Sequence, residues 1–167
     1  MATVFQETME RYAAWQGDPE GEAPAYPVYN GARVVGLVDL FPRFFGQLVV
    51  FPRDPGGLGE DVSMEDLPIH VQSSVGLVVN TFRRRMRQLF EVRAIRHEEG
   101  YAVPDHPHAV VFPAARGEGV GLYQPSALGE LGPDYFTGMQ AMLTPPVEET
   151  RRLDQEIELN YTLLDPT

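Results

Sequence analysis

Two histidines separated by one residue are the side chains of this sequence best suited to chemistry. His106 and His108 lie at the start of an apolar run that is typical of a strand. Side chains alternate between the two faces of a strand, so both imidazoles are expected on one face and Pro107 on the other. Such a pair can act as a nucleophile and its helper, can supply two metal ligands, or can have no chemical role. The residues alone leave these three alternatives open.

The composition limits the partners of the chain. Its 167 residues suit a single domain, and its formal net charge of −11 argues against binding to nucleic-acid phosphates or to an anionic membrane surface. This charge does not exclude a small anionic ligand. The absence of cysteine excludes disulfides, a thiol nucleophile and cysteine-containing metal sites. No signal-peptide pattern or membrane-spanning apolar run is visible, so we expect a cytoplasmic protein with neither nucleic acid nor membrane as a partner.

The apolar pattern predicts the elements that position the two histidines. Thr3 and Gln6 have capping-box spacing, which predicts a helix to about residue 15. The dipeptide Asn30-Gly31 predicts a two-residue hairpin turn. Apolar residues spaced three or four apart from Leu67 to Leu89 predict a helix of roughly 20 residues, with a cap at Ser63 or Asp66 and Pro68 in its first turn. The other predicted elements are strands at 34–40, 47–51, 92–97 and 108–112, a turn at 98–100, and a charged helix at 148–160.

Short connections between successive strands favour an antiparallel sheet. We therefore predict an α+β fold rather than a parallel βαβ fold. The whole chain, 1–167, is expected to form one domain, with its core at about 26–116 and a Pro-rich C-terminal extension.

Several charged or glycine-rich features are better interpreted as structural. The arginines near the end of the long helix suit its dipole and are expected in solvent. The Gly-x-Gly spacing after residue 116 lacks the strand-to-helix context of a dinucleotide site. His70 is expected on the surface, and Arg96 and His97 are expected in a solvent-exposed turn. The arginines and glycines concerned are Arg83, Arg84, Arg85, Arg87, Gly117, Gly119 and Gly121.

The order of elements and motifs resembles that of the histidine triad (HIT) superfamily over residues 26–116. The matching features, in chain order, are a strand ending in Asp39, Pro42 in the following turn, Gln47 eight residues after Asp39, a strand ending in Pro52, the long helix, a strand, Gly100 in a loop, and the run His106-Pro107-His108-Ala109-Val110-Val111-Phe112-Pro113. The resemblance implies a HIT-like fold: an antiparallel sheet of about five strands with a long helix and a C-terminal helix.

The resemblance also implies a nucleotide site. His108 matches the middle histidine of the family, which attacks the α-phosphorus of a nucleotide and carries a covalent nucleotidyl group. A neutral imidazole is a good nucleophile near pH 7, and the phosphoramidate that it forms is easily transferred. His106 matches the first histidine, which organises the site, and Asp39 matches the residue that binds the ribose hydroxyls. Gly100 falls in the loop that approaches phosphate, and Gln47 stands where many members have another histidine.

The third histidine of the triad is replaced by Val110, which can neither donate nor accept a proton. One function is a nucleotidyl hydrolase or transferase that acts through His108 on a nucleoside phosphate ester, phosphoramidate or polyphosphate. A second is a catalytically impaired protein that binds nucleotides or regulates. A third is a metal-binding His-x-His site completed by Asp105 or a nearby carboxylate, although two histidines do not make a site by themselves. No metal or cofactor is predicted, and the resemblance implies a homodimer paired through the long helices and the strand after them.

Overall fold

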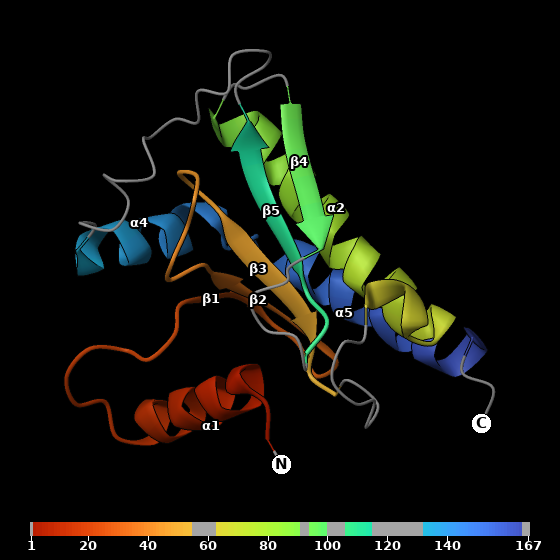
Figure 1. The fold of residues 1–167 in the computed structure, drawn as a ribbon, viewed down its shortest axis with the longest axis horizontal. Coiled ribbons are helices and arrows are strands. Elements are labelled where there is room, and N and C mark those ends of the chain that lie inside the picture. Colours follow the sequence, from red (N-terminus) through yellow and green to blue (C-terminus); the bar gives the residue numbers. More distant parts are fainter. Residues whose placement is uncertain (1, 55–62, 91–93, 100–105, 115–131, 165–167) are drawn as a thin grey trace.

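Figure 1 shows the computed structural model, which describes residues 2–54, 63–90, 94–99, 106–114 and 132–164. The elements in chain order are α1 (Val4–Gly17), β1 (Pro27–Asn30), β2 (Val34–Val38), β3 (Leu48–Pro52), the short 3-10 helix η1 (Met64–Asp66), α2 (Ile69–Phe90), β4 (Ala94–Glu99), β5 (Ala109–Ala114), α4 (Pro133–Leu143) and α5 (Val147–Leu164). Some residues named in the sequence analysis lie outside these ranges: Gly100, Asp105, Gly117, Gly119 and Gly121.

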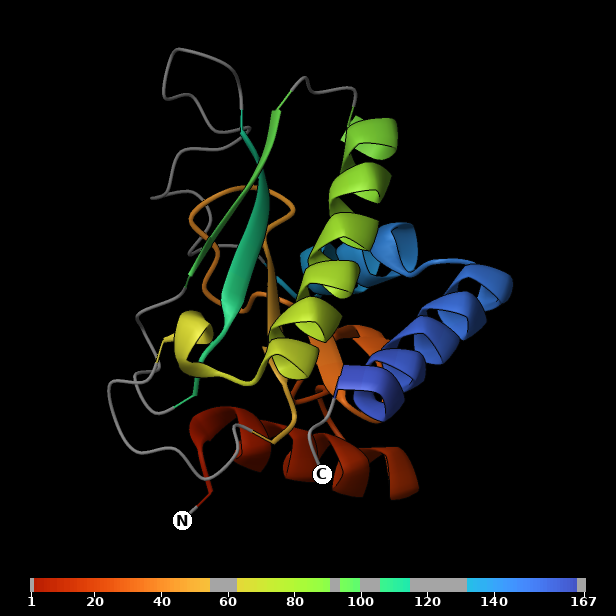
Figure 2. The same cartoon turned by 90° about the vertical axis from the view of Figure 1, so that its right-hand side faces the viewer.

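The five strands form one antiparallel sheet in the order β1-β2-β3-β5-β4. The predicted α+β fold with an antiparallel sheet of about five strands is therefore confirmed. The long helix α2 packs on β3, β4 and β5, and α5 packs along α2 (Figure 2). The end of β2 lies beside the start of β3, and the start of β5 lies beside the end of β3.

The two faces of the sheet are buried by different helices. Leu48 and Val111 belong to the main hydrophobic cluster, which includes the apolar stripe of α2. Val49 and Phe51 point the other way and pack with Met9 of α1. Full burial of such side chains stabilises the fold by about 1.5–3 kcal/mol each. Because both faces of β3 are covered, its position is fixed, and the residues that follow it can hold a functional side chain in place.

The helix α1 begins where the sequence predicts, whereas the predicted cap of Ser63 and Asp66 starts the short helix η1 and not α2. The Thr3 hydroxyl accepts a hydrogen bond from the Gln6 amide (3.2 Å), and the Gln6 side chain accepts one from the Thr3 amide (2.9 Å). This capping box starts α1, which continues to Gly17. The helix α2 follows Pro68 directly and has 22 residues. None of the described helices is long and apolar enough to cross a membrane.

The predicted two-residue turn at Asn30-Gly31 is wrong. Asn30 is the last residue of β1 and pairs with Val35, so the connection consists of residues 31–33. Gly31 does not have the positive φ of the predicted turn type. The reason is a tertiary contact: the Arg53 guanidinium donates to the Gly31 carbonyl oxygen (2.7 Å) and to the Asn30 side chain. These hydrogen bonds fix the connection, in which the Gly31 amide also donates to the Val34 carbonyl oxygen (3.1 Å).

Other boundaries also differ from the prediction. The strand β4 continues through Glu99, so the predicted turn does not begin at Glu98. The strand β5 starts at Ala109, and the two histidines lie just before it. The helix α4 was missed in the Pro-rich extension, where Pro133 occupies the first helical position that proline tolerates. The C-terminal helix is longer than predicted, with 18 residues.

Candidate functional site

His106 and His108 lie together beneath α1. Both side chains are buried, with 0% and 4% of their surfaces exposed. The Phe5 ring of α1 contacts both imidazoles edge-on, at centroid distances of 5.2 and 5.1 Å, and it stacks on Phe51 of β3 at 4.3 Å. The helix α1 therefore forms one wall of the site, which sequence analysis missed because nothing in the capping box indicates what the helix packs on.

Both ring nitrogens of His106 are held by neighbours. Its Nε2 lies 2.6 Å from the Pro52 carbonyl oxygen, and its Nδ1 lies 2.6 Å from the Thr3 hydroxyl. A carbonyl oxygen can only accept, so Nε2 donates, and the neutral ring accepts the Thr3 hydroxyl hydrogen at Nδ1. His106 thus links the end of β3 to the start of α1, which suits a positioning residue rather than a nucleophile.

His108 is held by only one of its nitrogens. Its Nδ1 lies 3.0 Å from the His106 carbonyl oxygen and must donate to it. The lone pair is therefore on Nε2, which has no hydrogen-bond partner among the described residues. Burial lowers the pKa of His108, although the hydrogen bond to His106 and the charge of Asp39 act in the opposite direction. The ring is neutral near pH 7, as a nitrogen nucleophile requires.

Asp39 and Gln47 form one hydrogen-bonded unit at the other end of β3. The Asp39 carboxylate accepts from the Gln47 side-chain amide (2.8 Å) and from the Phe41 backbone amide (2.9 Å). The Gln47 side-chain oxygen accepts from the Arg43 backbone amide (3.2 Å), and Gln47 is buried. Gln47 therefore braces the turn from residue 40 to 46. Asp39 is partly exposed, and its negative charge acts to raise the pKa of His108 against the larger effect of burial.

Several solved structures share this fold. A HIT-like protein involved in cell-cycle regulation from Bartonella henselae is 17% identical, with 84% of this chain and 96% of that chain covered at a TM-score of 0.55. A zinc-bound histidine triad family protein from Mycobacterium smegmatis is 20% identical, with 93% of this chain and 98% of that chain covered at a TM-score of 0.56. The chain has the histidine triad fold. A hypothetical histidine triad nucleotide-binding protein from Sulfolobus tokodaii is also similar, with 14% identity, coverage of 93% and 97%, and a TM-score of 0.53. No family model matches the sequence, and no curated protein sequence is significantly similar to it.

Val110, which the sequence resemblance matches to the third histidine of the triad, has apolar surroundings with one ion pair beside them. Val110 is buried in a small cluster with Phe112 and Phe44. Its partner on β4 is Glu98, and paired residues on neighbouring strands share a face of the sheet. The Glu98 carboxylate accepts a hydrogen bond from the Arg43 guanidinium (3.0 Å). Arg43 is thus a charged group next to Val110 that sequence analysis missed, because residues 43 and 98 meet only in the folded sheet.

The remaining charged candidates lie elsewhere. Arg96 and His97 are exposed, as expected, but they are in β4 rather than in a turn. The His97 ring contacts the Arg83 guanidinium at 3.3 Å. Within the described ranges, no group of three or more histidine, aspartate or glutamate side chains could hold a metal ion. The metal hypothesis named Asp105 or a nearby carboxylate as the third ligand, and Asp105 lies outside those ranges.

The contact between Thr3 and His106 gives a first testable prediction. Thr3→Val should lower the free energy of unfolding by about 2–3 kcal/mol, because it removes a helix cap and the hydrogen bond to a buried ring nitrogen of His106. Chemical denaturation measures this change. Thr3→Ser keeps both hydrogen bonds and should stay near the wild type. Thr8→Val, which removes only a bond to the Val4 carbonyl oxygen within the same helix, is the matched control. Equal effects of the substitutions at positions 3 and 8 would contradict the assigned contact.

Proposed function

We propose that the chain is a member of the HIT family that transfers a nucleotidyl group through His108. The Nε2 lone pair attacks the α-phosphorus of a nucleoside phosphate ester, phosphoramidate or polyphosphate, and the bond from phosphorus to the leaving group breaks. The nucleotidyl group is then carried on Nε2. Water or another acceptor attacks the same phosphorus, the bond to Nε2 breaks, and a nucleoside monophosphate or a transferred nucleotide is released.

The tautomer of His108 carries this proposal. Because Nδ1 is fixed on the His106 carbonyl oxygen, the ring presents Nε2 with a lone pair and without a competing protein partner among the described residues. The hydrogen bonds of His106 fix that carbonyl group in turn. Asp39 is proposed to bind the ribose hydroxyls, with Gln47 bracing it, and Gly100 is proposed to lie near the phosphate. The nucleotide-binding description of the Sulfolobus tokodaii protein supports a ligand of this class.

Covalent labelling tests the proposal directly. The protein is incubated briefly with a nucleoside phosphoramidate, a dinucleoside polyphosphate or a nucleotide sugar, quenched and analysed by mass spectrometry at neutral to alkaline pH, where phosphoramidates survive. We expect a nucleotidyl group on His108 with at least one substrate. Absence of both label and turnover with all three classes would refute the enzymatic function.

We infer that Arg43 takes over part of the role of the missing third histidine. Val110 cannot interact with a phosphate oxygen, whereas Arg43 lies beside it through its contact with Glu98. Arg43 also lies 6.0 Å from the ring centroids of Phe44 and Phe112, at the apolar floor of this region. A guanidinium can neutralise negative charge that develops on phosphate oxygens, although it cannot protonate the leaving group.

A second candidate function is nucleotide binding without turnover. It is favoured by Val110, because no proton donor replaces the third histidine at that position. Calorimetry with nucleoside monophosphates distinguishes the two functions. Micromolar binding that survives His108→Ala, together with no turnover, would favour the binding protein.

We also propose a homodimer paired through β4 and α2, and a cytoplasmic location. The strand β4 is at the edge of the sheet, and a two-fold axis through His97 would place Arg96 of each copy opposite Glu98 of the other. Sedimentation should show a dimer at micromolar concentration. Arg96→Glu should weaken it through like-charge contacts, and Arg96→Glu combined with Glu98→Arg should restore it. A wild type that stays monomeric at about 100 μM would refute the dimer.

A further inference from the structure

The helix α1 stands apart from the other long helices and is attached by few side chains. Among the described helices, it alone packs on the face of the sheet that carries Val49 and Phe51, while α2, α4 and α5 cover the opposite face (Figure 2). Met9 is the one buried residue of the helix itself, and the connection to β1 is exposed from residue 18 to residue 22. Each contact between α1 and the histidines therefore matters for how the helix is held.

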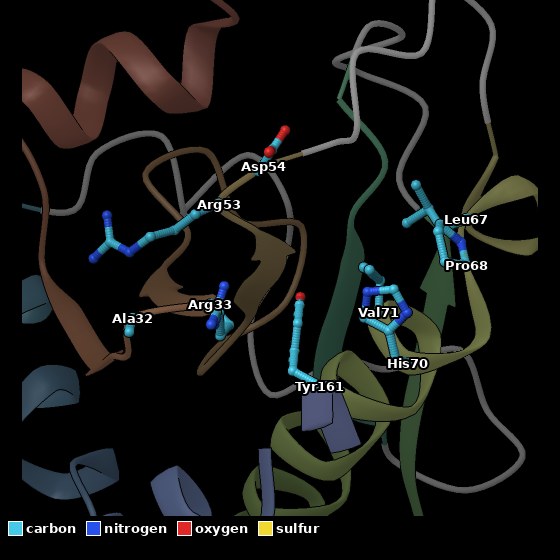
Figure 3. Close-up of a pocket in the computed structure, with 9 residues that line it drawn as sticks. All are labelled: Ala32, Arg33, Arg53, Asp54, Leu67, Pro68, His70, Val71 and Tyr161. Atoms are coloured by element: carbon cyan, nitrogen blue, oxygen red, sulfur yellow. The ribbon is translucent and has the colours of Figure 1, made fainter. Parts of the chain in front are cut away.

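His70 provides a comparison within the same protein, and here the sequence-based prediction was wrong. His70 was expected on the surface, but only 8% of it is exposed, because Tyr161 of α5 packs edge-on against its ring at a centroid distance of 4.6 Å. Both side chains border a small cavity (Figure 3). The buried Nδ1 of His70 has no hydrogen-bond partner among the described residues. Burial of an imidazole under a docked helix thus does not by itself supply a partner for a ring nitrogen.

At His106 the docked helix does supply that partner. The Thr3 hydroxyl lies 2.6 Å from His106 Nδ1, and both side chains are buried. The same hydroxyl accepts a hydrogen bond from the Gln6 amide (3.2 Å). A hydroxyl has one hydrogen and two lone pairs, so Thr3 can cap the helix and donate to the ring at the same time. Its hydrogen occupies the one ring lone pair of neutral His106, because Nε2 donates to the Pro52 carbonyl oxygen.

The backbone of His106 passes this constraint on to His108. A ring that is anchored at both nitrogens cannot turn, and the carbonyl oxygen of the same residue accepts the hydrogen of His108 Nδ1 at 3.0 Å. Phe5 of α1 contacts both imidazoles edge-on, which limits the rotation of His108. A misplacement of about 1 Å at a reacting group can cost about 100-fold in rate. The position of α1 is therefore coupled to the position of the nucleophile.

We propose that docking of α1 controls the reactivity of His108, with Thr3 as a positioning residue that acts through His106. This control rests on the function proposed for His108 and adds a means of regulating it. A change that lifts Thr3 and Phe5 from the histidines slows nucleotidyl transfer without altering the nucleophile itself. Because Asp39 lies at the other end of β3, kcat should respond much more than KM.

Three substitutions separate the contact with His106 from the cap of the helix. Thr3→Val removes both, and Thr3→Ser keeps both. Gln6→Ala removes the hydrogen bond from the Thr3 amide but leaves the Thr3 hydroxyl on His106, so it is the matched control. With the substrate that labels the wild type, we expect kcat to fall by a factor of about 10 to 100 in Thr3→Val, with KM within about threefold. The other two variants should stay within about threefold of the wild type in kcat.

Hydrogen exchange at the imidazole gives a measurement that does not depend on turnover. The hydrogen on His108 Nδ1 is buried on the His106 carbonyl oxygen, so its resonance should exchange slowly with solvent in the wild type. Thr3→Val should speed this exchange at least about tenfold, and Gln6→Ala should not. If the wild type lacks nucleotidyl transfer, the proposed reaction fails, and the exchange rates still decide whether α1 positions His108.

Equal effects of Thr3→Val and Gln6→Ala, or wild-type exchange at His108 in Thr3→Val, would overturn the proposal. If Thr3→Val does not fold, Thr3→Asp replaces it, because an ionised aspartate caps a helix well but has no hydrogen to donate to His106. We expect kcat of this variant to be at least about tenfold below that of Thr3→Ser, with faster exchange at His108. A folded Thr3→Asp variant that matches Thr3→Ser in either measurement would also overturn the proposal.

Discussion

Replacement of His108 by asparagine is expected to lower nucleotidyl transfer by a factor of about 10⁴ or more, the usual cost of removing a covalent nucleophile. Asparagine can still donate to the His106 carbonyl oxygen, so the variant removes Nε2 with little change in the surrounding contacts. His106 cannot substitute for the lost nitrogen, because the Pro52 carbonyl oxygen and the Thr3 hydroxyl occupy both of its ring nitrogens. Single-turnover kinetics with the substrate that labels the wild type measures this loss.

His97→Asn is the control for this substitution. His97 is exposed on β4 and contacts Arg83, away from α1 and the buried histidine pair. We expect its rate to stay within about twofold of the wild type. Retention of more than a tenth of the wild-type rate by His108→Asn would show that another group forms the covalent bond.

The pH dependence of the wild type follows from the lowered pKa of His108. The neutral ring is the reactive form, so kcat/KM should be constant at neutral pH and should fall only below the ordinary histidine pKa of 6.5. The same shift affects stability. Between the unfolded and the lower folded pKa, the unfolded chain binds more protons, so stability is fully present above pH 6.5 and is lost as the pH falls through the folded pKa. His108→Asn should lack this contribution, which acid titration of the unfolding free energy measures.

The sequence was most informative where a contact depends on local spacing. The His-x-His run and the eight-residue step from Asp39 to Gln47 singled out two pairs of residues, and the structure brings each pair together. The reason is geometric. Residues 106 and 108 are adjacent along an extended chain, and residues 39 and 47 are adjacent across a tight antiparallel connection in which the Asp39 amide donates to the Gln47 carbonyl oxygen.

Contacts between distant segments could not be predicted from these patterns. The sequence predicts that Thr3 caps a helix. Only the packing of α1 on the sheet shows that its hydroxyl also forms a hydrogen bond with His106. Arg53 overrides the turn preference of Asn30-Gly31 by a hydrogen bond across 22 residues. Burial of His70 likewise depends on α5. In each case the partner is chosen by tertiary packing, which a hydrophobic period or a turn motif does not encode.

Replacement of Arg43 by glutamine is expected to lower kcat by a factor of about 10 to 100, with a smaller change in KM. A loss of about tenfold is expected if solvent screens the charge of Arg43, which lies at the protein surface. A loss of about 100-fold is typical of removing one donor that stabilises transition-state charge. Stability should change by less than about 1 kcal/mol, because the ion pair with Glu98 is exposed. Steady-state kinetics and denaturation together separate these effects. Arg84→Gln on the exposed surface of α2 removes the same charge and should leave kcat unchanged.

The origin of the effect can be tested at the neighbouring strand position. If Arg43 compensates for the missing third histidine, Val110→His should restore activity to Arg43→Gln, because the new imidazole would lie beside Glu98 and could both contact phosphate and protonate the leaving group. Its benefit should be larger for substrates with poor leaving groups, since a guanidinium cannot donate a proton to them. If Arg43→Gln and Arg84→Gln reduce kcat equally, or if Arg43→Gln has no effect on any substrate that labels His108, the charge at position 43 has no part in the reaction.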